Sequence, residues 1–130
     1  MKILALRTDK PEAELYIYDG QKKLAEIKWK AHRRLAETIH NKVDEILNKS
    51  SISLSEIDGI VFYKGPGSYT GLRIGASVAN AISYAQKTSV ISSGDEAWLK
   101  SGIVDLLAGR NDKIVSPEYG APPRTTQPKK

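Results

Sequence analysis

The chain has 130 residues, enough for one compact domain. With 40% hydrophobic and 27% charged residues, its composition is that of a globular protein and excludes a disordered or fibrous chain. It contains no cysteine and 2 histidines, which excludes disulfide scaffolds and thiolate metal sites. No apolar run approaches the ~20 residues of a membrane span and no secretory leader is recognisable, so we expect a cytoplasmic protein without membrane contact.

The chain is basic. Lys and Arg number 20 against 15 for Asp and Glu, a formal net charge of +5. Basic residues gather between Lys22 and Arg34 and again between Arg124 and Lys130. Clustered cations favour phosphates or acidic partners, so a small RNA-binding module with a basic surface is one open function. The alternative is a solvated face that only maintains solubility.

The first half of the chain predicts three strands, a helix and a fourth strand. Residues 3–6 form a short apolar run typical of a buried strand. Residues 14–18 and 24–30 are strand-like and are joined through Asp19-Gly20, a hairpin signal. Apolar residues then recur at helical spacing over 35–49. Ser53 and Glu56 have capping-box spacing before an apolar strand at 59–63.

The second half predicts helix, strand and helix over 68–86, 89–92 and 95–107. For the last helix, Ser93 is the expected N-cap, Glu96 completes a capping box, and Gly109 ends the helix. The order βββαβαβα predicts an α/β fold with a mixed five-stranded sheet. We expect a folded lobe over 1–109 and a proline-rich, basic, flexible tail over 110–130.

The glycine-rich turn at 64–67 fits none of the common phosphate or nucleophile motifs. A Walker A loop is not present, because no lysine follows a second glycine at the required spacing. In the dinucleotide fingerprint, Thr70 would occupy the place of the third glycine. A nucleophile elbow would centre on serine, whereas Gly67 to Gly71 centres on Tyr69.

Small residues line one side of the helix that follows the turn. Gly71, Gly75, Ala79 and Ser83 lie at four-residue spacing, which lets another backbone approach closely. Apolar residues occupy two sides of this helix, so we expect it to be buried on two sides. One side can cover the sheet. The other is covered either by a partner protein or by helix 35–49 of the same chain.

The segment Gly-Pro-Gly-Ser-Tyr-Thr-Gly-Leu-Arg-Ile-Gly, residues 65–75, resembles the signature of the TsaB (YeaZ) family, which usually has Phe at the position of Tyr69. The resemblance extends over roughly residues 1–100. It implies a single ribonuclease H-like lobe of the actin/Hsp70-like ATPase fold. Family members usually continue into a second lobe, so we expect a short form that lacks most of it. Pro117-Glu-Tyr119 also resembles the family's closing Pro-x-Tyr-x-Arg.

The resemblance implies a non-catalytic partner in forming N6-threonylcarbamoyladenosine in tRNA. Such proteins support a TsaD-type transferase, which a TsaE-type ATPase joins; the same face can form a homodimer, and tRNA is contacted indirectly. No cofactor is expected in this chain, because ATP and metal belong to the partner enzyme. The expected partner-interface residues are Leu35, Ile39, Val43, Gly67, Ser68, Thr70, Gly71, Leu72, Arg73, Gly75, Ala76, Ala79 and Ile82. Arg73 is the best polar candidate, because its planar donor fork can hold a carboxylate or a carbonyl in fixed geometry.

Two segments of the chain depart from the family pattern. The family's Leu-Asp-Thr-Ser start is here Leu6-Arg7-Thr8-Asp9, so a cation replaces the carboxylate that helps related ATPases hold metal and nucleotide. Leu35 stands where the family often has His. Independent ATP hydrolysis is therefore not expected, although an ATP-dependent phosphotransferase or a peptidase of this fold is a second open function.

Overall fold

The computed structural model describes residues 1–118. Its elements follow the predicted order, βββαβαβα, which is confirmed. Two 3₁₀ turns, His32–Arg34 and Leu54–Glu56, precede α1 and β4 respectively. The strands and helices are β1 (Lys2–Arg7), β2 (Glu12–Asp19), β3 (Lys22–Lys30), α1 (Leu35–Lys49), β4 (Gly59–Tyr63), α2 (Tyr69–Gln86), β5 (Ser89–Ser93) and α3 (Trp98–Leu107).

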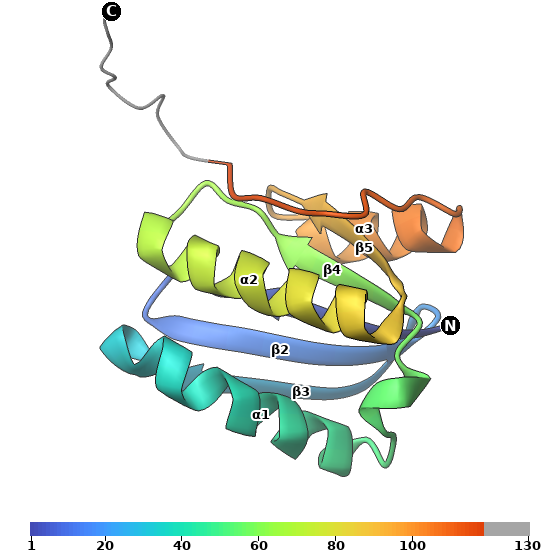
Figure 1. The fold of residues 1–130 in the computed structure, drawn as a ribbon, viewed down its shortest axis with the longest axis horizontal. Helices are drawn as coiled ribbons and strands as arrows, with labels where there is room; N and C mark the ends of the chain where they lie inside the picture. Colours follow the sequence, from blue (N-terminus) through green and yellow to red (C-terminus); the bar gives the residue numbers. More distant parts are fainter. Residues whose placement is uncertain (119–130) are drawn as a thin grey trace, which may run out of the picture.

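The five strands form one mixed sheet in the order β3-β2-β1-β4-β5 (Figure 1). The first three strands are an antiparallel meander, whereas β4 and β5 run parallel to β1. At the centre, Ala5 lies between Tyr16 of β2 and Val61 of β4. All five residues of β4 are buried, as expected for a strand covered on both faces.

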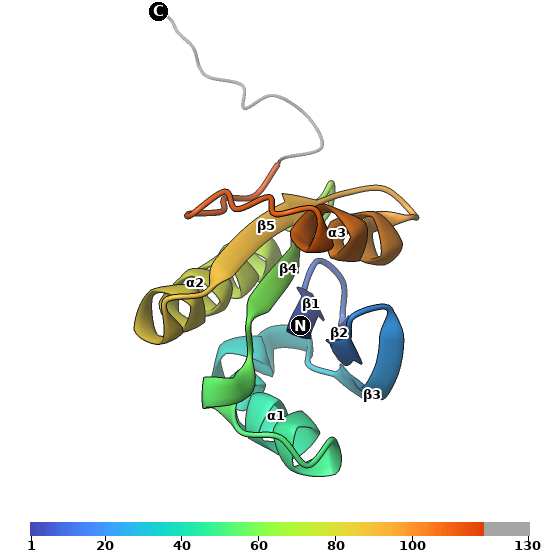
Figure 2. The same ribbon diagram turned by 90° about the vertical axis from the view of Figure 1, so that its right-hand side faces the viewer.

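Helices cover both faces of this sheet. Figures 1 and 2 show α1 and α2 side by side on one face and α3 on the other. On the α3 face, the Trp98 ring packs edge-to-face on Tyr16 and Tyr63, with ring centroids 6.1 and 5.6 Å apart. On the opposite face, α1 covers β2 and β3, and the Trp29 Nε1–H donates to Thr38 Oγ1 at 3.0 Å. The arrangement leaves the outer surfaces of α1 and α2 toward solvent.

The segment after α3 closes the β5 edge of the sheet. Asn111 and Asp112 accept hydrogen bonds from the backbone N–H groups of Val90 and Ser92, both at 3.1 Å. The Asp112 N–H in turn donates to the Val90 carbonyl at 2.8 Å. Farther along, Val115 exchanges two 2.9 Å hydrogen bonds with the Asn80 side chain. Residues 110–118 of the expected tail are therefore attached to the lobe, and the remainder of that prediction, residues 119–130, lies outside the described residues.

One predicted helix start is wrong. The last helix begins at Trp98, not near residue 95, and its N-cap is Ala97 without a side-chain bond. Ser93 instead ends β5, where its carbonyl accepts from the Lys64 N–H at 2.9 Å. Pairing with the neighbouring strand segment therefore outweighs the local capping signal. The predicted end is confirmed, since Gly109 has the positive φ of +96° that favours glycine after a helix.

No helix within residues 1–118 combines the length and apolarity that crossing a bilayer requires.

The hydrogen bonds of Asp112 predict that the stability of the β5 edge of the sheet depends on pH. Burial alone would raise the pKa of Asp112, but hydrogen bonds from Arg110 and the Ser92 N–H hold that pKa below its ordinary value of 3.8. The contact therefore stabilises the edge above about pH 4 and is lost as the pH falls through the lowered pKa. We expect Asp112→Ala to speed hydrogen exchange of the Ser92 amide by up to about tenfold at neutral pH. Asp105→Ala is the control, because Asp105 also pairs with Arg110; equal acceleration in both variants would contradict the assignment.

Candidate partner interface

The glycine-rich turn connects β4 to α2 beside the end of β1. Ser68 is the N-cap of α2, and its Oγ accepts from the Gly71 N–H at 3.5 Å. The Ser68 N–H donates to the Asp9 carbonyl at 3.0 Å, which ties the turn to the loop after β1. Gly65 has φ +115° and supplies the left-handed backbone that the turn requires.

The line of small residues on α2 faces this chain's own backbone. A Cβ on Gly71 would lie 1.9 Å from the Thr8 carbonyl oxygen, and one on Gly75 would lie 2.2 Å from Thr8 Oγ1. Thr8 is 1% exposed and its Oγ1 donates to the Gly71 carbonyl at 2.7 Å. The glycines are thus explained by the loop after β1. The close approach that these small residues predict is therefore made to this chain's own loop and not to a partner protein.

The expected interface residues divide into a buried and an exposed set. For the residues on α1 and α2, the position around the helix axis decides which set they belong to. Side chains that face the sheet are buried, and side chains about 100° further around the axis are exposed. Gly71 and Ile82 are half-buried. The exposed ones are Gly67, Ser68, Thr70 and Arg73. The buried ones, of which Ile39 also lines the groove and Leu35 the hollow described below, are Leu35, Ile39, Val43, Leu72, Gly75, Ala76 and Ala79.

A shallow groove of about 430 Å³ runs between the outer sides of α1 and α2. Half of its lining residues have small or short side chains, and Arg73 and His40 are the basic ones. Five groove residues are absent from the predicted interface, although their helical phase, next to the predicted buried residues, was a usable signal: Ala36, His40, Ile74, Ser77 and Val78. The lining residues are Ala36, Ile39, His40, Thr70, Arg73, Ile74, Ser77 and Val78.

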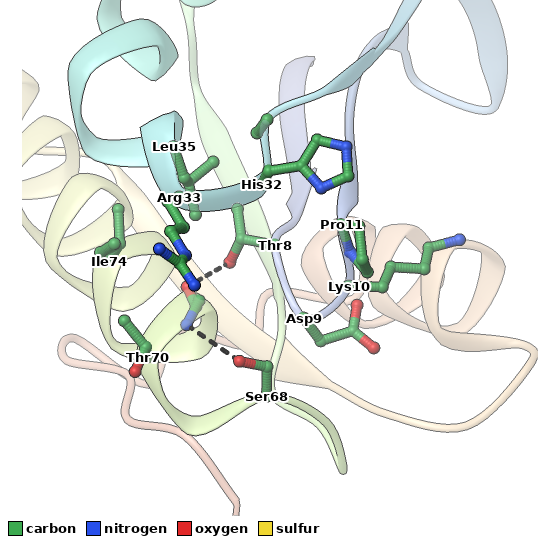
Figure 3. Close-up of a pocket in the computed structure, with 12 residues that line it drawn as sticks. Thr8, Asp9, Lys10, Pro11, His32, Arg33, Leu35, Ser68, Thr70 and Ile74 are labelled. Carbon is green, nitrogen blue, oxygen red and sulfur yellow. Dashed lines mark hydrogen bonds between the residues drawn. The ribbon is translucent and has the colours of Figure 1, made fainter.

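A hollow of about 420 Å³ lies at the N-terminal end of this groove. Figure 3 shows Arg33 reaching toward the first turn of α2, whereas Lys10 and His32 point away from it. Thr70 and Ile74 line both the hollow and the groove, so the two are continuous. The other lining residues are Thr8, Asp9, Pro11, Ala31, Leu35, Ser68 and Gly71.

Arg7 is clamped at the carboxyl end of β1. Its Nε donates to Asp9 Oδ1 at 2.7 Å and its Nη2 to Asp9 Oδ2 at 3.2 Å. The guanidinium also stacks on the Tyr63 ring, with Cζ 4.0 Å from the ring centroid. Burial would lower the pKa of Arg7, but the Asp9 carboxylate raises it overall, so the group is a fixed cation. A cation therefore occupies the strand end where the resemblance places a metal-binding carboxylate in related ATPases.

The neighbouring acidic side chain is also neutralised. Glu14 accepts from the Tyr16 hydroxyl at 2.5 Å, and Lys10 Nζ lies 2.6 Å from its other oxygen. Burial would raise the pKa of Glu14, but these hydrogen bonds hold it below its ordinary value. Among residues 1–118, no three His, Asp or Glu side chains come together in a way that could hold a metal ion.

Comparisons with known proteins identify the family of this chain. The chain is 34% identical to the tRNA threonylcarbamoyladenosine biosynthesis protein TsaB of Haemophilus influenzae over 112 residues, which cover 85% of this chain. It is 30% identical to the protein of that name from Escherichia coli over 89 residues, which cover 60% of this chain. The chain belongs to the TsaB (YeaZ) family. It spans 47% and 38% of the length of these two relatives.

Solved structures place this TsaB-family lobe in the actin-like ATPase fold. YeaZ from Pseudomonas aeruginosa superposes with a TM-score of 0.68 at 24% identity, covering 78% of this chain and 50% of that one. A protein described as similar to peptidase YeaZ from the same organism gives a TM-score of 0.69 at 26% identity, covering 74% and 44%. The family model of TsaD, tRNA N6-adenosine threonylcarbamoyltransferase, also matches residues 29–92. The matched stretch includes both helices of the groove.

The packing of the glycine line predicts a stability effect. Alanine at an open helix position is more stable than glycine by about 1 kcal/mol, but at Gly75 the added Cβ meets Thr8. We expect Gly75→Ala to lower the free energy of unfolding by about 1–3 kcal/mol in urea denaturation. Adding Thr8→Ala to this variant should recover part of the loss. A stabilised Gly75→Ala protein would contradict the contact.

Proposed function

We propose that this chain is a non-catalytic accessory subunit in the formation of N6-threonylcarbamoyladenosine in tRNA, and that it binds a TsaD-type transferase through the α1/α2 groove. Family membership supports the pathway. A TsaD relative from Geobacter metallireducens is 36% identical over 61 residues, 47% of this chain and 18% of that protein, so the proposed partner carries a related lobe. The observation that carries the proposal is the open groove between two helices.

The groove has the shape that helix packing requires. Ala36, Thr70 and Ser77 present short side chains, so the axis of a partner helix can approach within the ~8–10 Å typical of helix pairs. Tyr84 continues the outer side of α2 and is 88% exposed. Tyr84 lines a separate hollow near the C-terminal end of α2, and large exposed aromatic side chains are enriched in protein interfaces. The same surface is available to a second copy, and a TsaE-type ATPase would join the assembled pair.

A basic RNA-binding module has less support than partner binding. In the basic stretch between Lys22 and Arg34, Lys23 and Lys28 both pair with Glu26, and Arg34 pairs with Glu37. Paired cations release fewer counterions on binding phosphate, so the surface is less suited to RNA than its composition indicates.

Filling the groove should abolish partner binding without disturbing the fold. Ser77 is exposed and lines the groove, so Ser77→Trp places a bulky ring where the partner helix would pack. We expect at least about a hundredfold loss of affinity for the TsaD-type subunit, measured by titration calorimetry of one purified subunit into the other. Ser101→Trp, on an exposed position of α3, is the matched control and should bind normally. Equal affinity of both variants would place the partner elsewhere.

The clamped arginine predicts that the chain alone does not use ATP. The Arg7–Asp9 pair at the end of β1 leaves no free carboxylate there to hold a magnesium ion. In titration calorimetry with ATP and magnesium, we expect no heat of binding. A protein concentration of about 100 micromolar would detect even a weak nucleotide site. Arg7→Asp, which restores the family's carboxylate, tests whether the cation is responsible. Strong ATP binding by the unaltered chain would favour the enzyme alternative.

A further inference from the structure

The segment after α3 returns to the glycine-rich turn. It runs along the β5 edge of the sheet, so that α2 lies between this segment and α1 (Figure 1). At the turn, the Glu118 N–H donates to the Lys64 carbonyl at 2.6 Å, and Glu118 Oε1 lies 3.1 Å from Lys64 Nζ. A Cβ on Gly65 would lie 2.4 Å from the Glu118 carbonyl oxygen. The segment therefore approaches the turn more closely than a side chain at residue 65 would permit without movement.

A second contact joins the same segment to α2. Val115 is 4% exposed and exchanges two 2.9 Å hydrogen bonds with the side-chain amide of Asn80. This amide takes the place of a neighbouring strand, because it binds both the N–H and the C=O of one residue. The flanking Ile114 and Ser116 are exposed, so Val115 is the buried residue of this stretch. We name residues 113–118 the strap, which extends from α2 to the start of the turn that leads into α2.

The glycine-rich turn is held at both ends by segments that are distant in sequence. The strap holds its start at Lys64, and the N–H of Ser68, directly after the turn, donates to the Asp9 carbonyl at 3.0 Å. Because Ser68 is also the N-cap of α2, a shift of the turn is transmitted to the first turn of this helix. Thr70 in that first turn lines the groove. The strap is thus connected to the groove through the turn, although the two share no residue.

We propose that the strap is a detachable conformational device, which fixes the glycine-rich turn when it is bound and loosens the turn when it is released. The ties that the described residues show are the two Asn80 hydrogen bonds, the Glu118 backbone bond, one ion pair and the buried Val115 side chain. An exposed ion pair contributes little, so Asn80 and Val115 supply most of the hold. A segment with so few buried contacts opens at a lower free-energy cost than the whole domain. Its release leaves the Lys64 carbonyl without its donor and removes the close contact at Gly65.

Hydrogen exchange of the full chain tests the strap. Asn80→Ala removes both amide hydrogen bonds, and because alanine is the better helix former, it does so without weakening α2. We expect the Ser68 amide, which the strap does not touch, to exchange at least about fivefold faster by NMR. Val115→Ala should have the same effect, whereas the matched control Ser77→Ala, at an exposed position of α2, should stay within about twofold. An unchanged Ser68 amide in both strap variants would overturn the inference, and so would equal acceleration of the β1 amides, which indicates global destabilisation.

A binding measurement extends the inference to the groove, and this step rests on the proposed function. Asn80 and Val115 do not line the groove, so their substitution acts on a partner there only through the turn. We expect Asn80→Ala to weaken binding of the TsaD-type subunit about two- to tenfold in titration calorimetry. Faster Ser68 exchange with unchanged affinity would overturn the link between strap and groove. If Ser77→Trp also leaves the affinity unchanged, the proposed function fails, while the exchange measurement on the isolated chain still decides the strap.

Discussion

The contact between the loop after β1 and the glycine face of α2 determines the rest of the structure. Thr8 lies against Gly71 and Gly75 at distances that no side chain larger than hydrogen permits without movement. This contact holds α2 over β1 and β4, while α1 covers β2 and β3. The groove lies between the outer sides of these two helices. The shape of the groove thus depends on Thr8, Gly71 and Gly75, whose contact fixes the position of α2.

The family signature acquires a physical meaning from this contact. Gly67, Gly71 and Gly75 all approach Thr8 or Asp9, so the repeated glycines belong to one intrachain packing surface. Arg73 lies on another side of the same helix and is exposed. A single motif therefore supplies both the internal face that fixes the helix and an external face available to a partner.

Much of the fold follows from sequence, and the missing parts have definite causes. Helix α1 was predicted with its observed bounds because its apolar residues have strong helical periodicity. The sequence does not indicate which segment packs against the small residues of α2. Thr8 is distant in sequence, and the same spacing of small residues would suit any backbone that approaches closely. Ser93 was misassigned because its carbonyl is used by a neighbouring segment. The groove residues Ala36 and Ser77 were missed because helical phase was used to find the buried sides of the helices and not the exposed positions next to them.

The two margins of the sheet differ in how they resist further pairing. Side chains of Asn111 and Asp112 occupy the backbone donors of β5, so that margin is filled. Strand β3 forms the other margin and carries Lys22, Lys23, Lys28 and Lys30. Adding a foreign strand there would crowd and dehydrate several ammonium groups, a well-known natural defence against fibril-like growth. Self-association by sheet extension is thereby suppressed on both sides.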